Sequence, residues 1–343
     1  MVEVLRQKLV HKRAWRRADL QDDASWIVVL DRKDVKEIDA ALCHVHSLGS
    51  AIPFTADAFP LPTLSATLAT IPDRLENDVG VVHIRGLPRE LYSADECALI
   101  YWGIGVHVGM PVSQSSAGEL IGHVRDEGRT LDDPSARPCH TRNEVCFHSD
   151  QLPFDVLGWF CVRNAKRGGD RALTSVDAVH NVILEERPDL LDVLYRPFNI
   201  DWRGEEPPGE PPWYRCPMLS YAGGKVTSRI ASSAYLASVA RFGEELALTD
   251  IQREALDFVQ EVASRPELSW PMDLDEGDMV FINNHAILHA RQPFEDHDDP
   301  DLKRHLLRMW IALPAARRRK LAPILAERYS FVIRGGIPKK TVT

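Results

Sequence analysis

The amino-acid sequence predicts a domain of the α+β class that is mainly β with flanking helices. Apolar runs rich in β-branched and aromatic residues occupy residues 155–165, 277–285 and 304–313, and turn-forming or acidic residues separate them. Helical periodicity interrupts these runs, most clearly after Thr249. With 343 residues, of which 44% are hydrophobic, the chain is long enough to bury one large core. We therefore expect one domain over residues 1–343.

The N-terminal part, residues 1–75, has the pattern of a peripheral lead-in. It contains a helix-like stretch followed by the Pro-rich segment 51–64, which favours extended loop. No sharp linker follows, and the apolar, β-branched run at 79–87 leads into a helical pattern that starts after Ser93. The sequence therefore places the β core within residues 76–313.

A long excursion at 108–143 separates this first strand and helix from the rest of the core. It is rich in Gly, Ser, Asp, Pro and Arg and shows no periodicity, and loops of this length in compact domains are often functional. After it the β pattern resumes at 145–150, and helices are predicted at 176–186 and from the capping-box pair Thr249 and Gln252 onward. We expect the last of these helices to brace the core from outside.

Charge and cysteine content narrow the class of partner. The formal net charge is −9, with 50 acidic residues against 41 Lys and Arg, which disfavours a nucleic-acid partner. The six cysteines are scattered and favour reduced thiols, and neither a signal peptide nor a run of eighteen apolar residues is present. We expect a cytoplasmic protein that acts on a small molecule and has no membrane partner, and homo-oligomer formation stays open.

The sharpest local pattern is Phe147-His148-Ser149-Asp150. Alternate side chains of a strand lie on one face, so His148 and Asp150 project together with a small residue between them. Downstream, two histidines, His285 and His289, stand four residues apart. By the same rule Arg304 and Arg308, also four apart, share one face of the last strand.

This set of residue types has a known chemical logic. Two imidazoles and one carboxylate on one side of an iron ion leave the opposite positions open for a bidentate 2-oxo acid and for dioxygen. An arginine supplies a forked, permanently charged group for the far carboxylate of such a cosubstrate. The ordered pattern therefore points to an iron site.

Four segments in order, FHSD, GGDRALTS, NNHAILHARQPF and KRHLLRMW, resemble the TauD/TfdA family, the taurine dioxygenase and clavaminate synthase-like oxygenases. The resemblance implies a double-stranded β-helix, or jelly-roll, that uses Fe(II), 2-oxoglutarate and O2. Carried over to this chain, it makes His148, Asp150 and His289 the metal ligands. It makes Arg304 the partner of the 2-oxoglutarate carboxylate, and it matches Arg308 to a position that family members use toward an anionic group of the substrate.

One position departs from the family pattern. After the Gly-Gly-Asp turn the family often has Thr or Ser, which helps to bind the 2-oxoglutarate carboxylate, whereas this chain has Arg171. Either Arg171 adds a second positive charge to that pocket, or a local shift gives the hydroxyl role to Thr174 or Ser175. Both alternatives stay open at the level of sequence.

Other histidines have a simpler interpretation. His285 is expected to be packed or hydrogen-bonded, and the segment HAILH lacks the glutamate of a zincin motif. His107, His123 and His180 have no partner pattern and are expected to be structural. Asp150 argues against halogenation, because halogenating relatives replace this carboxylate with a small residue.

The substrate rim is expected in two loops. Gln114 and Arg125 of the excursion at 108–143 are candidate polar contacts, although a covering loop without contacts would give the same pattern. The aromatic and Pro-rich stretch at 209–221 is a second candidate.

Together these patterns predict a dioxygenase that hydroxylates an unactivated C–H bond of a small carboxylate-bearing molecule. An amino acid or a natural-product intermediate is the expected kind of substrate, with Arg308 as the motivating residue. Desaturation, cyclisation and C–X cleavage start from the same hydrogen abstraction and are alternatives. A metal-dependent hydrolase or isomerase, or a metal-binding sensor without catalysis, are the rivals from other classes.

Overall fold

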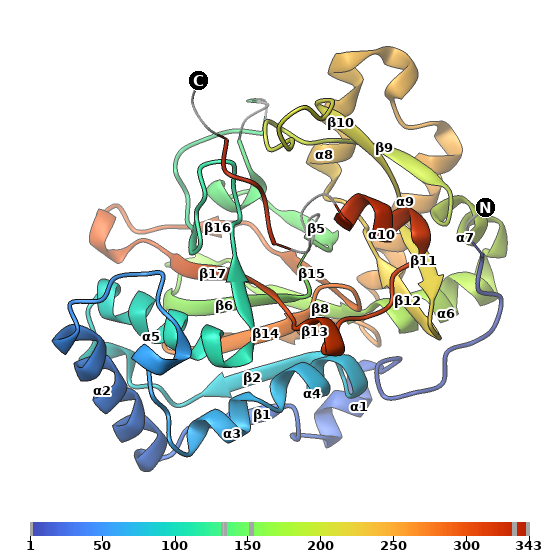
Figure 1. Cartoon of the computed structure of the whole chain (residues 1–343). Coiled ribbons are helices and arrows are strands. Elements are labelled where there is room, and N and C mark those ends of the chain that lie inside the picture. The colour runs from blue at the N-terminus through green and yellow to red at the C-terminus, as the bar shows by residue number, and fades with distance from the viewer. Residues whose placement is uncertain (1–2, 132, 134–135, 151–153, 331–334, 341–343) are drawn as a thin grey trace.

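The computed structural model describes residues 3–131, 133, 136–150, 154–330 and 335–340, with side chains left out at 327–330. Its centre is a large sheet in the order β1-β2-β14-β6-β17-β3, with β4 also paired to β17 (Figure 1). All pairs in this sheet are antiparallel except β1 with β2. Its strands are β1 (Ile27–Val29), β2 (Val81–Arg85), β3 (Met110–Val112), β4 (Gly122–Val124), β6 (Val156–Arg163), β14 (Met279–Asn283) and β17 (His305–Ala312).

A smaller antiparallel sheet faces the large one and carries the two predicted metal-ligand motifs. Its order is β13-β8-β15-β5. The strands are β5 (Val145–His148), β8 (Arg171–Ser175), β13 (Trp270–Met272) and β15 (Ile287–Arg291). Short two-stranded pairs complete the β structure, namely β7 (Arg167–Gly168) with β16 (Phe294–Glu295), β9 (Pro197–Asp201) with β10 (Trp213–Pro217), and β11 (Leu219–Ala222) with β12 (Lys225–Ser228).

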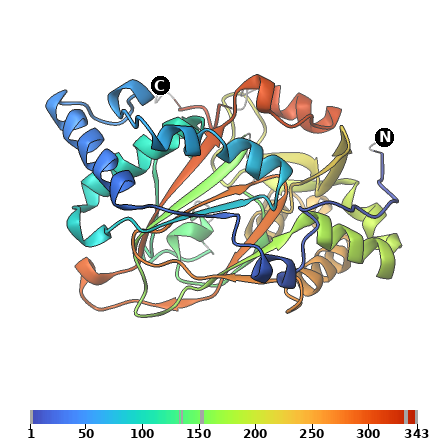
Figure 2. The same ribbon diagram turned by 90° about the horizontal axis from the view of Figure 1, so that it is seen from below.

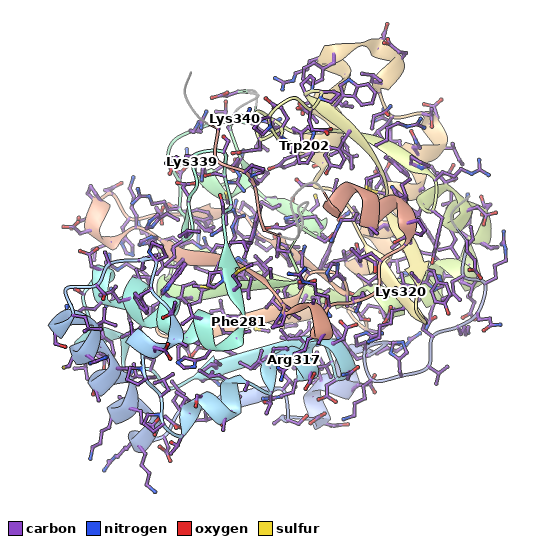
Figure 3. The ribbon with its side chains drawn as sticks, viewed as in Figure 1. Trp202, Phe281, Arg317, Lys320, Lys339 and Lys340 are labelled. Atoms are coloured by element: carbon purple, nitrogen blue, oxygen red, sulfur yellow. The ribbon has the colours of Figure 1, made fainter. Side chains whose placement is uncertain are left out.

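Alternation along the central strands produces two cores. On β17, Leu306 and Trp310 face the interior between the sheets, whereas Leu307, Met309 and Ile311 face the helices outside. The outer helices lie along that face of the large sheet, as Figure 2 shows from below. They are α2 (Arg32–Ser47), α3 (Leu64–Leu68), α4 (Ile71–Asn77) and α5 (Ala94–Val108). Phe281 of β14 belongs to this outer core and is fully buried (Figure 3).

The remaining helices pack on the other side, against the small sheet and the inner core. Helix α9 contacts both α6 and α7, and its buried residues recur at helical spacing. The bounds are α1 (Arg17–Asp22), α6 (Val176–Glu186), α7 (Pro188–Leu194), α8 (Ser233–Ala237), α9 (Asp250–Ala263) and α10 (Pro323–Ser330). Within the described residues, no helix has both the length and the apolar character that crossing a membrane requires.

Several local predictions are confirmed. Ser93 caps α5 and Thr249 caps α9, each through a capping box with the residue three positions later. Helix α6 spans the predicted 176–186. The N-terminal part differs from the expected peripheral lead-in, because β1 pairs with β2 and extends the large sheet by one strand.

The stretch at 209–221 also differs from the expected loop. It contains β10 and the start of β11. Strand β10 pairs with β9, and Trp202 directly follows the last residue of β9. The C-terminal segment passes beside this hairpin, with Lys340 Nζ donating to the carbonyl oxygen of Gly204 (Figure 3). Ile337 of the same segment reaches the wall of the main cavity.

Candidate metal centre

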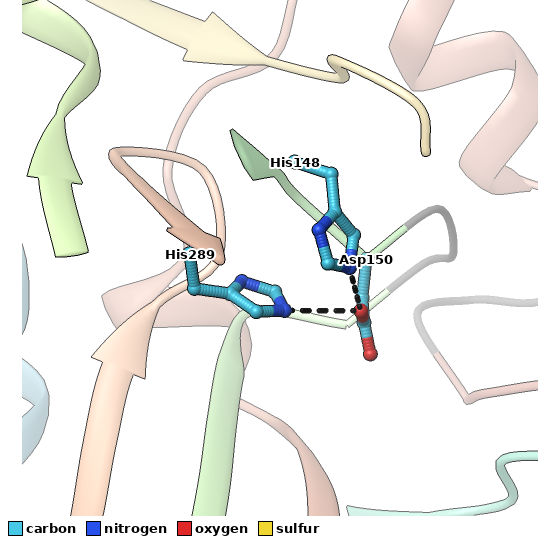
Figure 4. Close-up of side chains that lie close together, drawn as sticks. All are labelled: His148, Asp150 and His289. Carbon is cyan, nitrogen blue, oxygen red and sulfur yellow. Dashed lines mark ion pairs between the residues drawn. The ribbon is translucent and has the colours of Figure 1, made fainter. Parts of the chain in front are cut away.

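The two metal-ligand motifs meet at the pairing of β5 with β15. His148 ends β5 and stands opposite His289 in register, with their ring centroids 4.1 Å apart. Asp150 follows β5 by two residues, and its side chain turns toward both imidazoles (Figure 4). Its Oδ1 lies 3.6 Å from His148 Nε2 and 3.6 Å from His289 Nε2. The structure thus brings together the three residues that the sequence pattern selected.

These three side chains fit a metal ion. One donor atom from each lies within 4.8 Å of the others, and no other group of this kind occurs among the described residues. His148 Nδ1 lies 2.8 Å from the carbonyl oxygen of Cys146, which can only accept. Nδ1 therefore carries the proton, and the lone pair of Nε2 faces Asp150 and the site.

Asp150 is held from both its backbone and its carboxylate. Its N–H donates to Asn284 Oδ1 at 3.0 Å, and its carbonyl oxygen accepts from Asn284 Nδ2 at 2.9 Å. Oδ2 accepts from Trp310 Nε1 at 2.9 Å and from Arg308 Nη1 at 3.3 Å. Because Oδ2 is occupied in this way, Oδ1 is left to face the two imidazoles.

Electrostatics favour the protonation states that metal ligands need. Burial alone would raise the pKa of Asp150, but Arg308 and the two histidines outweigh it and hold the pKa well below its usual range. Burial, together with His148 nearby, lowers the pKa of His289 well below its ordinary value. The site therefore presents a carboxylate and neutral imidazole, which are the metal-binding forms.

The three side chains lie at the wall of a cavity of about 870 Å³, which includes its open mouth. Aromatic residues form much of the lining, and four arginines, Arg137, Arg171, Arg291 and Arg308, outnumber the three acidic residues among them, Asp150, Asp201 and Glu205. The aromatic members of the lining are Trp159, Trp202, Tyr214, Tyr235 and Trp310. The cavity is therefore suited to a small molecule with an apolar body and an anionic end.

Among the described residues, two arginines beside the cavity lack an ion partner. Arg171 and Arg304 are both buried, and among the described residues no carboxylate lies within ion-pair distance of either. Arg171 Nε and Arg304 Nη1 are buried without a hydrogen-bond partner. Burial and then mutual repulsion with neighbouring arginines lower the pKa of Arg171 well below its usual value and that of Arg304 to about 10. Burying two such charges is costly, and an anion bound between them would offset that cost.

The positions of the two differ. Arg171 lines the main cavity and also a neighbouring hollow, whereas Arg304 lines only that hollow. Gly169, at φ +80°, leaves room for Arg304, because a Cβ there would come within 3.0 Å of Arg304 Nε. Arg171 therefore stands between Arg304 and the metal-ligand cluster.

The other predicted site residues lie elsewhere. Thr174 is on the face of β8 opposite Arg171, and its hydroxyl donates to the carbonyl oxygen of Leu268. Ser175 caps α6. Arg125 follows β4 on the outside of the molecule and is exposed. The structure therefore brings neither Thr174 nor Arg125 into the cavity.

Gln114 is fully buried behind Arg308 and does not line the cavity. Its Oε1 accepts from Arg308 Nε at 2.7 Å, and its Nε2 donates to the carbonyl oxygens of Arg308 and Leu120. Gln114 therefore positions Arg308. His285 binds Asp155 and Arg229 in the interior, as expected for a hydrogen-bonded residue.

Sequence reasoning missed several residues that shape the site. Trp310 and Arg291 follow Arg308 and His289 by two positions, so the strand period that selected those residues could have found them. Asn284 stands inside a quoted motif, but only the fold shows that its side chain holds Asp150. Arg137 lies in the excursion at 108–143, where no periodicity distinguishes it from other arginines.

Comparisons with known proteins agree with this geometry. A profile described as "Taurine catabolism dioxygenase TauD, TfdA family" matches residues 44–310. The chain is 32% identical over 323 residues to FR-33289 synthase of Streptomyces rubellomurinus, covering 93% of this chain and 94% of that protein. The structure resembles that of an asparagine oxygenase with Fe(II), 3-hydroxyasparagine and succinate, with a TM-score of 0.66, 16% identity and coverage of 92% and 100% of the two chains.

A further solved structure, the non-heme iron oxygenase OrfP with Fe and α-ketoglutaric acid, has a TM-score of 0.60 and 15% identity, covering 87% of this chain and 97% of that one. At such low identity these two structures establish the fold alone, and they confirm the predicted jelly-roll.

Proposed function

Because the chain belongs to the TauD/TfdA family of Fe(II)- and 2-oxoglutarate-dependent dioxygenases, we propose that it hydroxylates an unactivated C–H bond of a small anionic molecule. The observation that carries the proposal is the convergence of His148, Asp150 and His289 at the wall of a cavity that also presents arginines. Fe(II) held by two imidazoles and a carboxylate supplies the activation of dioxygen, which is coupled to conversion of 2-oxoglutarate to succinate and CO2.

The protein's part is to hold and orient these components. His148 Nε2, His289 Nε2 and Asp150 Oδ1 would hold the metal, and Asn284 and Trp310 fix the orientation of the carboxylate. The aromatic lining limits access of water to the reacting C–H bond.

For the cosubstrate, we assign the far carboxylate of 2-oxoglutarate to Arg171 and Arg304. Both guanidinium groups are buried, have unpartnered N–H groups and lack a counter-ion among the described residues. Arg171 approaches from the cavity side and rests on Trp159, with Cζ 4.4 Å from the ring centroid. Arg304 adds a second positive charge from the side of the neighbouring hollow.

For the substrate, the anion expected from the sequence is a carboxylate facing Arg308, as in an amino acid. The asparagine oxygenase structure holds 3-hydroxyasparagine, and another structure of OrfP holds Fe, succinate and (3S)-hydroxy-L-Arg. These complexes support an amino-acid-sized substrate and hydroxylation over desaturation, cyclisation or C–X cleavage.

Anaerobic titration with Fe(II) and 2-oxoglutarate tests the proposal. We expect a weak visible charge-transfer band in the native protein, its loss in His289→Ala, and a need for more 2-oxoglutarate in Arg304→Gln. His123→Ala, which alters a histidine outside the cavity, serves as the matched control. Absence of the band from the native protein would sink the assignment.

Activity then separates the rival classes. Succinate release that depends on a small carboxylate, amino acids first, supports the oxygenase reaction. Turnover of a substrate without oxygen consumption or succinate would instead identify a hydrolase or an isomerase.

A further inference from the structure

Arg308 cannot serve alone as the anion-binding group of the cavity. Its Nε donates to Gln114 Oε1 at 2.7 Å, and its Nη1 donates to Asp150 Oδ2 at 3.3 Å. A guanidinium binds an oxyanion in a two-pronged way through the Nε/Nη2 edge or the Nη1/Nη2 edge. One donor of each edge is therefore already engaged, and part of the charge of Arg308 is neutralised by Asp150.

Arg137 offers the edge that Arg308 lacks. It lines the same cavity and is 8% exposed. Its Nη1 donates to the backbone oxygen of Gln114 at 2.9 Å, which fixes the group in place. Its Nε is buried without a partner, and neither Nε nor Nη2 forms a hydrogen bond with the described residues. Within the described residues the Nε/Nη2 edge is thus free, and its Nε is buried.

The two guanidinium groups converge on one wall. Their Cζ atoms lie 5.8 Å (Arg137) and 5.1 Å (Arg308) from the ring centroid of Trp310. Both also act on Cys139, whose pKa burial would raise but Arg308, Arg137 and His140 together lower to about 6. Stabilisation of this thiolate by both arginines is what an electropositive wall would produce.

Among the described residues, the nearby carboxylates do not pair with the Nε/Nη2 edge of Arg137. Glu205 lines the cavity and acts on Arg137 through its charge, but it lies beyond ion-pair distance and accepts the backbone N–H of Ser116. Asp201 accepts from the backbone N–H of Arg203 and from Ser238. Within the described part of the chain, no carboxylate pairs with Arg137.

We infer that Arg137 is a substrate-binding residue, and that it binds the anionic end of the substrate in a two-pronged way while Arg308 adds one further N–H and charge. The inference rests on the proposed function, because it takes the cavity beside the metal ligands as the substrate site. The group bound is an oxyanion that presents two oxygens to one edge, as a carboxylate, a sulfonate or a phospho group does. The body of the substrate would lie against Trp202, Tyr214 and Tyr235.

The test uses small oxyanions on the full-length protein loaded with metal and 2-oxoglutarate, so that the cosubstrate site is filled. Acetate, methanesulfonate and methylphosphonate are titrated by calorimetry, which separates the three sources of the oxyanion. We compare the native protein with Arg137→Gln, with Arg137→Lys, and with Arg142→Gln, an exposed arginine of the same loop. Thermal unfolding of each variant checks that it is folded.

For the anion that binds most tightly, we expect Arg137→Gln to lose on the order of tenfold or more in affinity, as for a hydrogen bond to a charged group. Arg137→Lys should recover only part of this loss, because it restores the charge but not the fork. Arg142→Gln should bind like the native protein. Native affinity in Arg137→Gln, full recovery in Arg137→Lys, or no binding of any of the three anions in the millimolar range by the native protein would each overturn the inference.

Alkylation of Cys139 by iodoacetamide gives a second readout. The bound anion should slow alkylation in the native protein but not in Arg137→Gln, a difference that a merely structural role of Arg137 would not produce. Arg137→Gln should also shift the pH dependence of alkylation upward, because one of the charges that stabilise the thiolate is removed. Exposed Cys146 is the internal reference.

Failure of the two proposals can be told apart. If the chelate band forms but Arg137→Gln has the same anion affinity and the same protection of Cys139 as the native protein, the inference is wrong and the proposed function stands. If the band never forms, the proposed function fails, and the calorimetric titration with Mn(II) in place of Fe(II) still decides the role of Arg137.

Discussion

The hydrogen bond from Trp310 to Asp150 should control iron affinity, and Trp310→Phe tests it. Trp310 is 2% exposed, and its Nε1 lies 2.9 Å from Asp150 Oδ2. Its ring stacks on Phe154 at 4.4 Å with an interplanar angle of 11°, a contact that phenylalanine can keep. The substitution therefore removes one N–H donor, and among the described residues it leaves Arg308, at 3.3 Å, as the remaining hydrogen-bond donor to Oδ2.

The expected magnitude follows from the charge of the acceptor. A hydrogen bond to a charged group contributes about 1.5–3 kcal/mol, which corresponds to roughly 10- to 100-fold in iron affinity. Loss of an outer-shell partner of a metal ligand typically has an effect of the same order, about 10- to 100-fold. Without this bond the carboxylate of Asp150 can rotate more easily, so Oδ1 is held less firmly toward the metal site.

The assay is anaerobic competition for Fe(II) against a coloured chelator, with thermal unfolding in parallel. Trp102→Phe is the matched control, because Trp102 is also buried and donates its Nε1 to a backbone oxygen, that of Phe54, in the outer core. Both variants should lose stability, and only Trp310→Phe should lose iron. Unchanged iron affinity in a folded Trp310→Phe would refute the reasoning.

Two further predictions concern buried charged groups, one outside the site and one within it. Burial would raise the pKa of Glu76, but Arg319 and Lys225 lower it from 4.5 to about 2. Stability from this carboxylate is therefore complete above pH 4.5 and is lost as the pH falls toward 2, by an amount of order 3 kcal/mol. Glu76→Gln should be less stable at neutral pH and should lose this part of the acid dependence, as unfolding in denaturant at several pH values can show; an acid slope equal to that of the native protein would contradict the assignment. For the cosubstrate, Arg171→Gln should raise the KM for 2-oxoglutarate by about tenfold, whereas Arg167→Gln, at an exposed position of the same turn, should not. An unchanged KM in Arg171→Gln would leave the carboxylate to Arg304 alone.

The cluster of His148, Asp150 and His289 was predictable in part from local pattern. Strand alternation put His148 and Asp150 on one side, and the resemblance to the TauD/TfdA family selected His289 over His285. The helix caps at Ser93 and Thr249 were predictable from local pattern alone, since a capping box is complete within four residues. Local rules therefore recovered the pair and the capped helix starts, and the resemblance added the second histidine.

The rest of the site depends on contacts between distant segments, which no local period encodes. Asn284 and Asp150 are 134 residues apart, and Gln114 and Arg308 are 194 apart. The sequence could not show which face of β8 lies toward the cavity. Arg171 is on that face, so Thr174, three positions later, points away from the cavity. Similarly, β1 forms an edge strand only because β2 lies beside it.

The contacts of Gln114 join the segment 108–143, which the sequence predicted as loop but which contains β3 and β4, to the candidate metal ligands. Gln114 holds Arg308 through its side chain and Arg137 through its backbone oxygen, and Arg308 in turn holds Asp150. An oxyanion bound at Arg137 and Arg308 would compete with Asp150 Oδ2 for the charge of Arg308, which places more weight on the Trp310 hydrogen bond in keeping Asp150 oriented. We therefore expect the loss of iron affinity in Trp310→Phe to grow when the anion is present. Equal losses with and without the anion would show that the substrate site and the metal ligands are independent.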